Sequence, residues 1–220
     1  MRLAATVMLV RPNVQASGIE VLMVRRSTQS AFAPDAFVFP GGTVDSIDYE
    51  RRSPWTPGRL RSEFRAVIPP ELCSSEAAVG ERDAAALVAA AVRELEEEAA
   101  IRMDPGDLHL FSHWITPPTE PRRYNTHFFI ARAGTHHVGI ADRVETHDER
   151  WVVPADALAQ YEAQTLHLVY PTIKHLERLA RFDNVESLLI FALEKPILTI
   201  MPNCAPHEGF VMPGALERAW

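Results

Sequence analysis

The sequence is poor in cysteine: Cys73 and Cys204 are its only two residues of that type. Two cysteines are too few for a disulfide framework, and these two do not have the paired spacing of a zinc site. Isolated thiols of this kind fit a reducing compartment. We therefore expect a cytoplasmic protein.

Long apolar runs and an excess of basic residues are also missing. The apolar opening, residues 3–10, stops at Arg11-Pro12, short of a membrane span and with no cleavage-like site after it. The formal net charge is -7, which disfavours binding through broad contact with a phosphate backbone. We expect neither a membrane nor a nucleic acid as partner.

The residues that are present have the balance of a globular protein, with 47% hydrophobic and 23% charged residues in a chain of 220. No repeat or linker requires a second domain, so we predict a single domain over residues 1–220. Runs of β-branched residues alternate with runs of helix formers, which predicts a mixed α/β fold. The expected strands are residues 4–10, 20–25, 37–39, 108–111, 126–131 and 149–153, and the expected helices are residues 83–99, 154–164, 171–181 and 185–193.

Three stretches depart from this alternation. Residues 40–42 predict a sharp turn, and residues 46–82 lose all periodicity, apart from a short helix expected near residues 60–66. The chain after about residue 155 is expected to form a helical extension. Its residues 202–209 look loop-like, and we expect them to cover another surface or a partner in a homodimer.

The helix expected at residues 83–99 carries three carboxylates on one face. Successive residues of a helix advance by about 100°, so Glu94, Glu97 and Glu98 lie within one wedge roughly 100° wide. Val88, Val92, Leu95 and Ala99 form a separate apolar stripe that can pack on a core. Glu96 lies outside the carboxylate wedge and is expected to face solvent.

Such a cluster is unfavourable on its own, because like charges at i, i+4 repel and acids near the C-terminal end oppose the helix dipole. A bound cation would reverse both penalties, and carboxylate oxygens suit Mg²⁺ or Mn²⁺. The alternative is a solvated acidic face, in which the helix would be an interaction surface of a structural protein.

The context of this helix resembles the Nudix hydrolase family, whose box reads G-x5-E-x7-R-E-U-x-E-E-x-G-U, with U a bulky aliphatic residue. Phe39-Pro40-Gly41-Gly42 is similar to the start of the box, and residues 93–101, Arg-Glu-Leu-Glu-Glu-Glu-Ala-Ala-Ile, are similar to its second half. The resemblance implies an α/β/α sandwich with a mixed sheet. It also implies that Arg93 orients carboxylates and that Glu94, Glu97, Glu98 and the Gly41 carbonyl are metal ligands.

Three features depart from the box. Gly42 and Arg93 are 51 positions apart instead of 14, so residues 46–82 would be an insertion within the box. Ala100 replaces the second glycine. The glutamate eight positions before the arginine would fall at Ala85, and the substitutes that we considered are Asp45, Glu81 and Asp83.

An interrupted box, together with residues 24–27, 37–45 and 114–118, is similar to the Nudix branch that includes the peroxisomal coenzyme A diphosphatases; the likeness spans roughly residues 3–155. It implies that metal-activated water cleaves a phosphoanhydride bond in a nucleoside diphosphate linked to another moiety, with coenzyme A or an acyl-coenzyme A as leads. The alternative is a catalytically impaired Nudix-fold module that binds nucleotides or regulates.

The resemblance also directs the search for further site residues. Glu97 and Glu94 are the expected catalytic carboxylates, and a late acid, Glu145 before Asp148 or Glu149, would act as base or ligand unless this segment is an ordinary acidic loop. For substrate binding we expect Arg122, Arg123 and Tyr124, then Arg25 with Arg26, because basic and aromatic loop residues often recognise nucleotides. The bland alternative for residues 122–124 is a solvated turn followed by a core aromatic.

Overall fold

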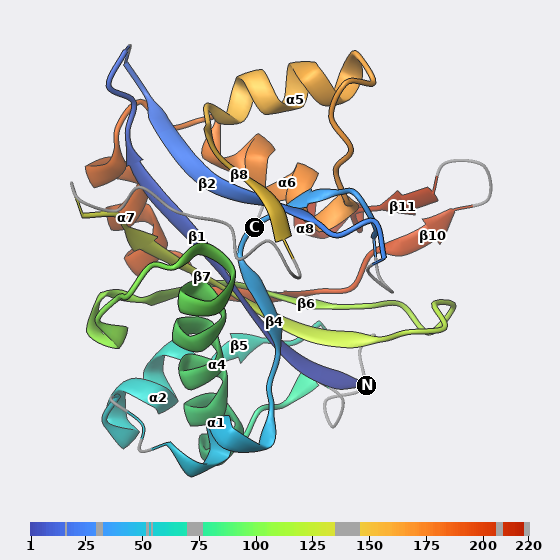
Figure 1. The fold of residues 1–220 in the computed structure, drawn as a ribbon. Helices are drawn as coiled ribbons and strands as arrows, with labels where there is room; N and C mark the ends of the chain where they lie inside the picture. The colour runs from blue at the N-terminus through green and yellow to red at the C-terminus, as the bar shows by residue number, and fades with distance from the viewer. Residues whose placement is uncertain are drawn as a thin grey trace.

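The fold is built on one large mixed sheet, shown in Figure 1. The structure is a computed structural model that describes residues 1–15, 17–29, 33–51, 53, 55–69, 77–134, 146–205 and 209–217. The strand order is β3-β2-β1-β7-β6-β9-β5, with β4 added to β1 and β8 added to β2. The strands are β1 Arg2–Pro12, β2 Ile19–Arg26, β3 Phe37–Val38, β4 Gly41–Thr43, β5 Ala66–Val67, β6 His109–Ile115, β7 Tyr124–Arg132, β8 Thr146–Val152 and β9 Ile197–Ile200.

Strand β1 organises this sheet because it has different partners along its two edges. One edge pairs in parallel with β7 over the whole stretch from Arg2 to Val10. The other edge pairs first with β4, at residues 4–6, and then with β2, at residues 10–12, both antiparallel. Along this edge β4 and β2 are therefore separate partners, with β4 beside the N-terminal part of β1 and β2 beside its C-terminal end.

Helices cover both faces of the sheet, which confirms the predicted α/β/α arrangement (Figure 1). On β1 the side chains of Val7 and Leu9 enter the core under α4, Glu81–Ala99, while Met8 enters the opposite core. This alternation is the period of two that a strand imposes. The opposite core is covered by α5 Pro154–Glu162, α6 Tyr170–Leu179 and α7 Val185–Glu194.

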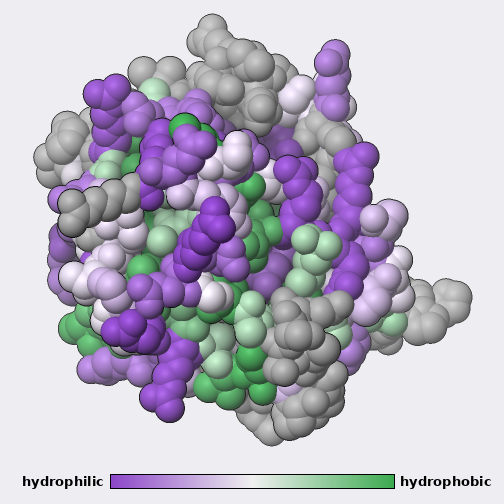
Figure 2. Space-filling model, turned by 90° about the horizontal axis from the view of Figure 1, so that it is seen from below, coloured by the Kyte–Doolittle hydropathy of each residue, from purple (hydrophilic) through white to green (hydrophobic). Residues whose placement is uncertain are grey.

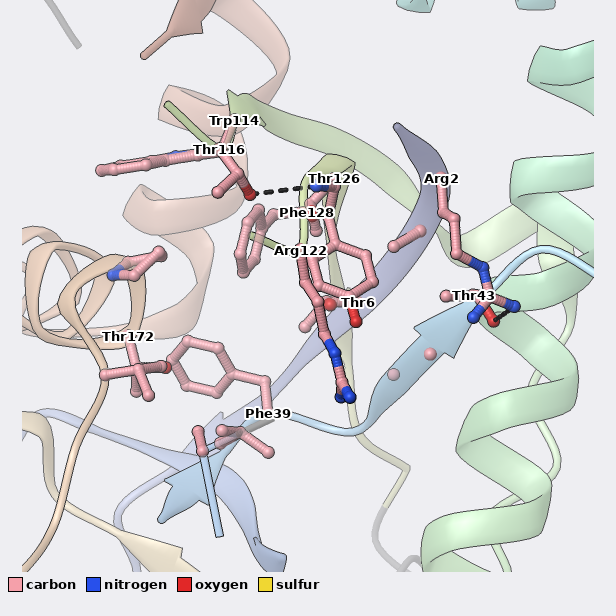
Figure 3. Close-up of a pocket in the computed structure, with 18 of the residues that line it drawn as sticks. Arg2, Thr6, Phe39, Thr43, Trp114, Thr116, Arg122, Thr126, Phe128 and Thr172 are labelled. Atoms are coloured by element: carbon pink, nitrogen blue, oxygen red, sulfur yellow. Dashed lines mark hydrogen bonds between the residues drawn. The ribbon is translucent and has the colours of Figure 1, made fainter. Parts of the chain in front are cut away.

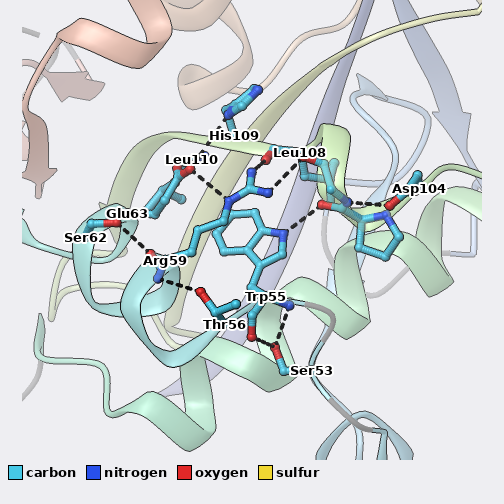
Figure 4. Close-up of polar contacts among 12 residues, drawn as sticks. Ser53, Trp55, Thr56, Arg59, Ser62, Glu63, Asp104, Leu108, His109 and Leu110 are labelled. Carbon is cyan, nitrogen blue, oxygen red and sulfur yellow. Dashed lines mark hydrogen bonds and ion pairs between the residues drawn. The ribbon is translucent and has the colours of Figure 1, made fainter.

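The stretch 46–82, the expected insertion, contains more structure than the one short helix that the sequence predicted near residues 60–66. It begins with helix α1, Ser46–Glu50, continues with α2, Pro57–Glu63, and adds β5 in parallel to β9. Figure 4 shows how α2 is attached: Arg59 lies over the Trp55 ring at 3.9 Å and donates to the carbonyls of Gly106 and Leu108. Trp55 Nε1 donates to the Pro105 carbonyl at 2.7 Å, within the 3-10 turn η1, Pro105–Asp107. The insertion is thus fixed to the segment that follows α4.

The predictions fail most at the C-terminal end. Strands β10, Asn203–Ala205, and β11, Gly209–Val211, pair antiparallel as a C-terminal hairpin where a loop was expected, and α8 follows at Gly214–Glu217. Strand β9 was also missed. Each of these strands has only three or four residues, too few to display an alternating pattern. Seen from below, the surface mixes hydrophilic and hydrophobic residues (Figure 2), and none of the helices in the described ranges combines the length and the apolar character of a membrane span.

Candidate functional site

The main pocket, of about 770 Å³, lies where β1, β4 and α4 meet the ends of β6 and β7. Its acidic side is lined by Glu94, Glu97 and Glu98 of α4, together with Gly41 and Gly42 of β4. Figure 3 shows its other side, where Phe39, Trp114 and Phe128 gather and Arg122 extends inward. The structure therefore brings the three predicted carboxylates to one cavity.

The two glycines are required by close approach, since the turn predicted at residues 40–42 is instead a short strand against β1. The Gly41 N–H donates to Glu98 Oε2 at 2.8 Å, and a Cβ on Gly41 would overlap the Ala5 carbonyl. A Cβ on Gly42 would overlap the carboxylate of Glu94. Backbone and carboxylates can share this small space only because both residues lack side chains.

Arg93 holds the carboxylates in place from within. It is 8% exposed, and its Nη1 donates to Glu94 and to Glu97, each at 2.8 Å. Its Nε and Nη2 donate to Asp48 at 3.0 and 2.8 Å, which is the paired geometry that makes guanidinium–carboxylate contacts strong. The hydrogen bonds that Arg93 donates to Asp48, followed by the charge of Glu94 and the hydrogen bonds to Glu97 and Glu94, raise the pKa of Arg93 against the opposing effect of burial. In this structure Arg93 therefore contacts two of the three predicted carboxylates as well as Asp48.

Asp48 corrects the search for the missing box glutamate. The three candidates have other positions: Asp83 accepts from the Tyr49 hydroxyl, Glu81 pairs with Arg61, and Asp45 lies at the pocket's edge and donates its N–H to Asp48. Counting forward in the box, G-x5-E from Gly42 ends at residue 48. Counting eight positions back from Arg93 leads to Ala85 instead, because the expected insertion lies between the two halves of the box. Asp48 therefore stands at the spacing from Gly42 that the box gives its acid, with aspartate in place of glutamate, and it pairs with Arg93.

Ala100 also occupies the position that the box glycine would take. Its backbone is left-handed, at φ 54° and ψ 29°, and its N–H closes α4 by donating to the carbonyl of Glu96. Glycine adopts this conformation more cheaply than alanine does. The substitution therefore preserves the helix end at a small cost in backbone strain.

The donor set fits a divalent cation in its chemistry. One guanidinium, that of Arg93, is paired with the three carboxylates of Asp48, Glu94 and Glu97, so negative charge exceeds positive charge in this cluster. Hard carboxylate oxygens are what Mg²⁺ and Mn²⁺ prefer. Among the described residues, no group of three or more Asp, Glu, His or Cys side chains is already arranged so that it could hold a metal ion. Glu97 is the most accessible of the three box glutamates, with 58% of its side chain exposed.

The predicted substrate contacts divide into two groups. Arg122 and Tyr124 line the main pocket, and so does Arg26. Arg123 instead donates through Nε to the Thr116 carbonyl at 3.0 Å, and Arg25 pairs with Asp35 beside a second pocket, of about 380 Å³. Neighbouring residues of a strand face opposite sides, which is why Arg25 and Arg26 part.

The late acid is not located. Glu145, our first choice, lies outside the described residues. Asp148 pairs with Arg150 at 2.6 Å, and Glu149 is on β8; the residues that line the main pocket include neither. They include Glu120, an acid that the sequence did not single out, from the loop between β6 and β7.

No protein-family model matches the chain, but a search of curated proteins finds similar sequences, among them a diphosphatase and a nudix hydrolase. Acyl-coenzyme A diphosphatase NUDT19 of Xenopus laevis is 24% identical over 92% of this chain and 73% of its own length. Putative nudix hydrolase 7 of Caenorhabditis elegans is 25% identical over 86% of this chain and 68% of its own length.

Structure comparison agrees. The crystal structure of a NUDIX hydrolase from Alicyclobacillus acidocaldarius superposes with a TM-score of 0.64 at 26% identity, covering 90% of this chain and 97% of that one. Its fold is thus shared over nearly the whole length of both proteins. With the box residues gathered around Arg93, the chain thus shares the fold of a Nudix hydrolase and is similar in sequence to an acyl-coenzyme A diphosphatase.

Proposed function

We propose that this protein hydrolyses a phosphoanhydride bond in a nucleoside diphosphate linked to another moiety, with coenzyme A and its acyl thioesters as first substrates. The observation that carries the proposal is the Arg93 cluster, which aligns Glu94 and Glu97 at the wall of the main pocket. The likeness to an acyl-coenzyme A diphosphatase supports the choice of substrate.

In this proposal Glu94, Glu97, Glu98 and the Gly41 carbonyl hold Mg²⁺ or Mn²⁺. When bound, such a cation would neutralise charge on the diphosphate and would lower the pKa of the water bound to it toward neutrality. Glu97 is our first choice for the catalytic carboxylate because its side chain is exposed at the pocket, whereas Glu98 is bonded to Gly41. Glu94 and Arg93 maintain its orientation.

The chain's own cations would bind the substrate phosphates. Arg2 and Arg122 extend into the pocket (Figure 3), and Arg26 also lines it. A planar guanidinium can make two parallel bonds to one phosphate, which favours arginine for this role. Tyr124, the first residue of β7, would position a neighbouring part of the substrate.

The alternative of a catalytically impaired binding module rested on Ala100 and on the missing box acid. The structure offers a substitute for both, since Ala100 takes the left-handed conformation and Asp48 pairs with Arg93. We therefore favour an active hydrolase.

The test is a panel of coenzyme A, octanoyl-coenzyme A, NADH, ADP-ribose, dinucleoside polyphosphates and nucleotide sugars, assayed with Mg²⁺, with Mn²⁺ and with a chelator. We expect cleavage of coenzyme A compounds only with metal. Glu97→Gln should lower kcat by about 100-fold or more, the usual contribution of a positioned acid or base. Glu96→Gln is the matched control, because Glu96 is exposed and pairs with Arg102. Cleavage in chelator, or equal activity of the two variants, would contradict the proposal.

A further inference from the structure

The side of the pocket away from the carboxylates is an aromatic wall that three separate segments build. Trp114 at the end of β6 lies 6.2 Å from Tyr170 of α6, centroid to centroid, and Tyr170 lies 5.9 Å from Phe210 of β11. All three line the main pocket, as does Pro202, just before β10. The C-terminal hairpin, expected to cover another surface, therefore contributes to this cavity.

The wall is held from behind by His175, a residue with no access to solvent. Its ring stacks on Phe128 at 4.1 Å and lies 5.5 Å from Trp114, and both of these rings line the pocket. Its Nδ1 is 2.6 Å from the Pro171 carbonyl and its Nε2 is 2.7 Å from Ser112 Oγ. The bond to Ser112 ties α6 to β6, and the bond to Pro171, within α6, fixes the orientation of the His175 ring.

The hairpin is tied to the same helix. Tyr170, at the start of α6, is hydrogen-bonded to the backbone of Met212, which follows β11 and is 3% exposed. Phe210 itself is only partly buried, so its ring has surface to offer a ligand. Tyr170 is also partly buried, whereas Trp114 is 3% exposed, so Phe210 is one of the two rings of the wall that have accessible surface.

The geometry of the rings favours one class of ligand group. The planes of Trp114 and Tyr170 are 71° apart and those of Tyr170 and Phe210 are 43° apart, so neither pair forms the parallel faces that would sandwich a flat base. In the stacked pair of this region, the face of Phe128 that could stack on a base is already occupied by the ring of His175. Oblique rings present a mixture of edges and faces, which suits a narrow, flexible aliphatic chain.

We propose that Phe210, with Trp114 and Tyr170, is a specificity determinant that receives the aliphatic chain of an acyl thioester while the diphosphate lies toward Arg122 and the box glutamates. This inference rests on the proposed function, and it assigns the selection between acylated and free substrate to the C-terminal hairpin. Each methylene removed from water contributes favourably to binding, so affinity should rise with chain length until the wall is filled.

The test compares Phe210→Ala with wild type on coenzyme A and on acetyl-, butyryl- and octanoyl-coenzyme A. We expect the wild-type KM to fall with chain length, and the variant to raise KM for the octanoyl ester about tenfold relative to coenzyme A, the size expected for losing part of one apolar contact. Phe210→Leu should restore most of the preference. Phe182→Ala is the matched control, since Phe182 packs on Phe191, 5.2 Å away, on the α7 side.

Binding measured by calorimetry without divalent metal separates this inference from the proposed function. Tighter binding of the octanoyl ester than of coenzyme A, lost in Phe210→Ala, supports the wall even if no substrate turns over, and in that case only the proposed function fails. Equal binding of both compounds to wild type overturns the wall. So does an equal loss for coenzyme A, ADP-ribose and the octanoyl ester in Phe210→Ala, because the ring would then serve the nucleotide.

Discussion

Replacing Asp48 with asparagine tests whether this residue is the acid that holds Arg93. Asp48 is 1% exposed and accepts two bonds from Arg93 and one from the Asp45 N–H. Breaking a buried ion pair by removing one partner costs about 3–5 kcal/mol. Arg93 keeps Glu94 and Glu97, so we expect the lower end, a loss of about 3 kcal/mol in the free energy of unfolding. Denaturation in urea, followed by far-UV circular dichroism, measures it.

Asp83→Asn is the control, because Asp83 accepts one hydroxyl bond from Tyr49 and should cost about 1 kcal/mol. The double variant Asp48→Asn with Arg93→Met should cost about 2 kcal/mol less than the sum of the single variants, since contacting residues couple. Equal losses from Asp48→Asn and Asp83→Asn, or simple additivity in the double variant, would refute the assignment of Asp48.

Three further changes have expected outcomes. Ala100→Gly should raise the free energy of unfolding by up to about 1 kcal/mol, because it relieves a left-handed alanine at some cost in unfolded-state entropy, and a loss in urea denaturation would contradict this. Arg122→Ala should raise KM for coenzyme A about tenfold, the loss of one phosphate contact, while Arg123→Ala should not; similar KM values for the two variants would argue against the phosphate role. Burial lowers the pKa values of three histidines, to about 4 and about 3 for His113 and His175 and well below 6.5 for His127. Because the folded state binds these protons less readily than the unfolded state, the contribution of the three histidines to stability should be complete above pH 6.5 and should fall as the pH drops toward 4. The free energy of unfolding should fall by at most roughly 4 kcal/mol per pH unit. A urea midpoint that stays constant between pH 7 and 5 would contradict this.

The sequence predicts α4 well because its pattern is local. None of its 19 residues is glycine or proline, and of the predicted apolar stripe Val88, Leu95 and Ala99 are fully buried and Val92 is partly buried. The helix starts two residues earlier than expected, at Glu81, where acidic residues in the first turn favour its start. The carboxylate face and its approach to Gly41 followed from this periodicity and the motif.

Other parts of the site depend on information that is not local. Asp48 was within reach of the sequence, but only by counting forward from Gly42, since the insertion separates it from Arg93. Alternation along β2 separates Arg25 from Arg26, but it does not reveal which of the two lines the main pocket. Phe210 comes from a three-residue strand whose position is set by pairing and by contact with Tyr170. No spacing rule connects residue 210 with residue 114.

The arrangement around Arg93 also divides two tasks among similar carboxylates. From sequence, the acidic face of α4 appeared to need a cation to offset its own repulsion. In the structure Arg93 offsets part of that repulsion itself, because it pairs with Asp48, Glu94 and Glu97 together. The fully buried Asp48 therefore stabilises the fold, whereas Glu97, more than half exposed at the pocket, remains accessible for a cation and substrate. This division explains why the Asp48 variant is expected to lose stability first and the Glu97 variant to lose activity while staying folded.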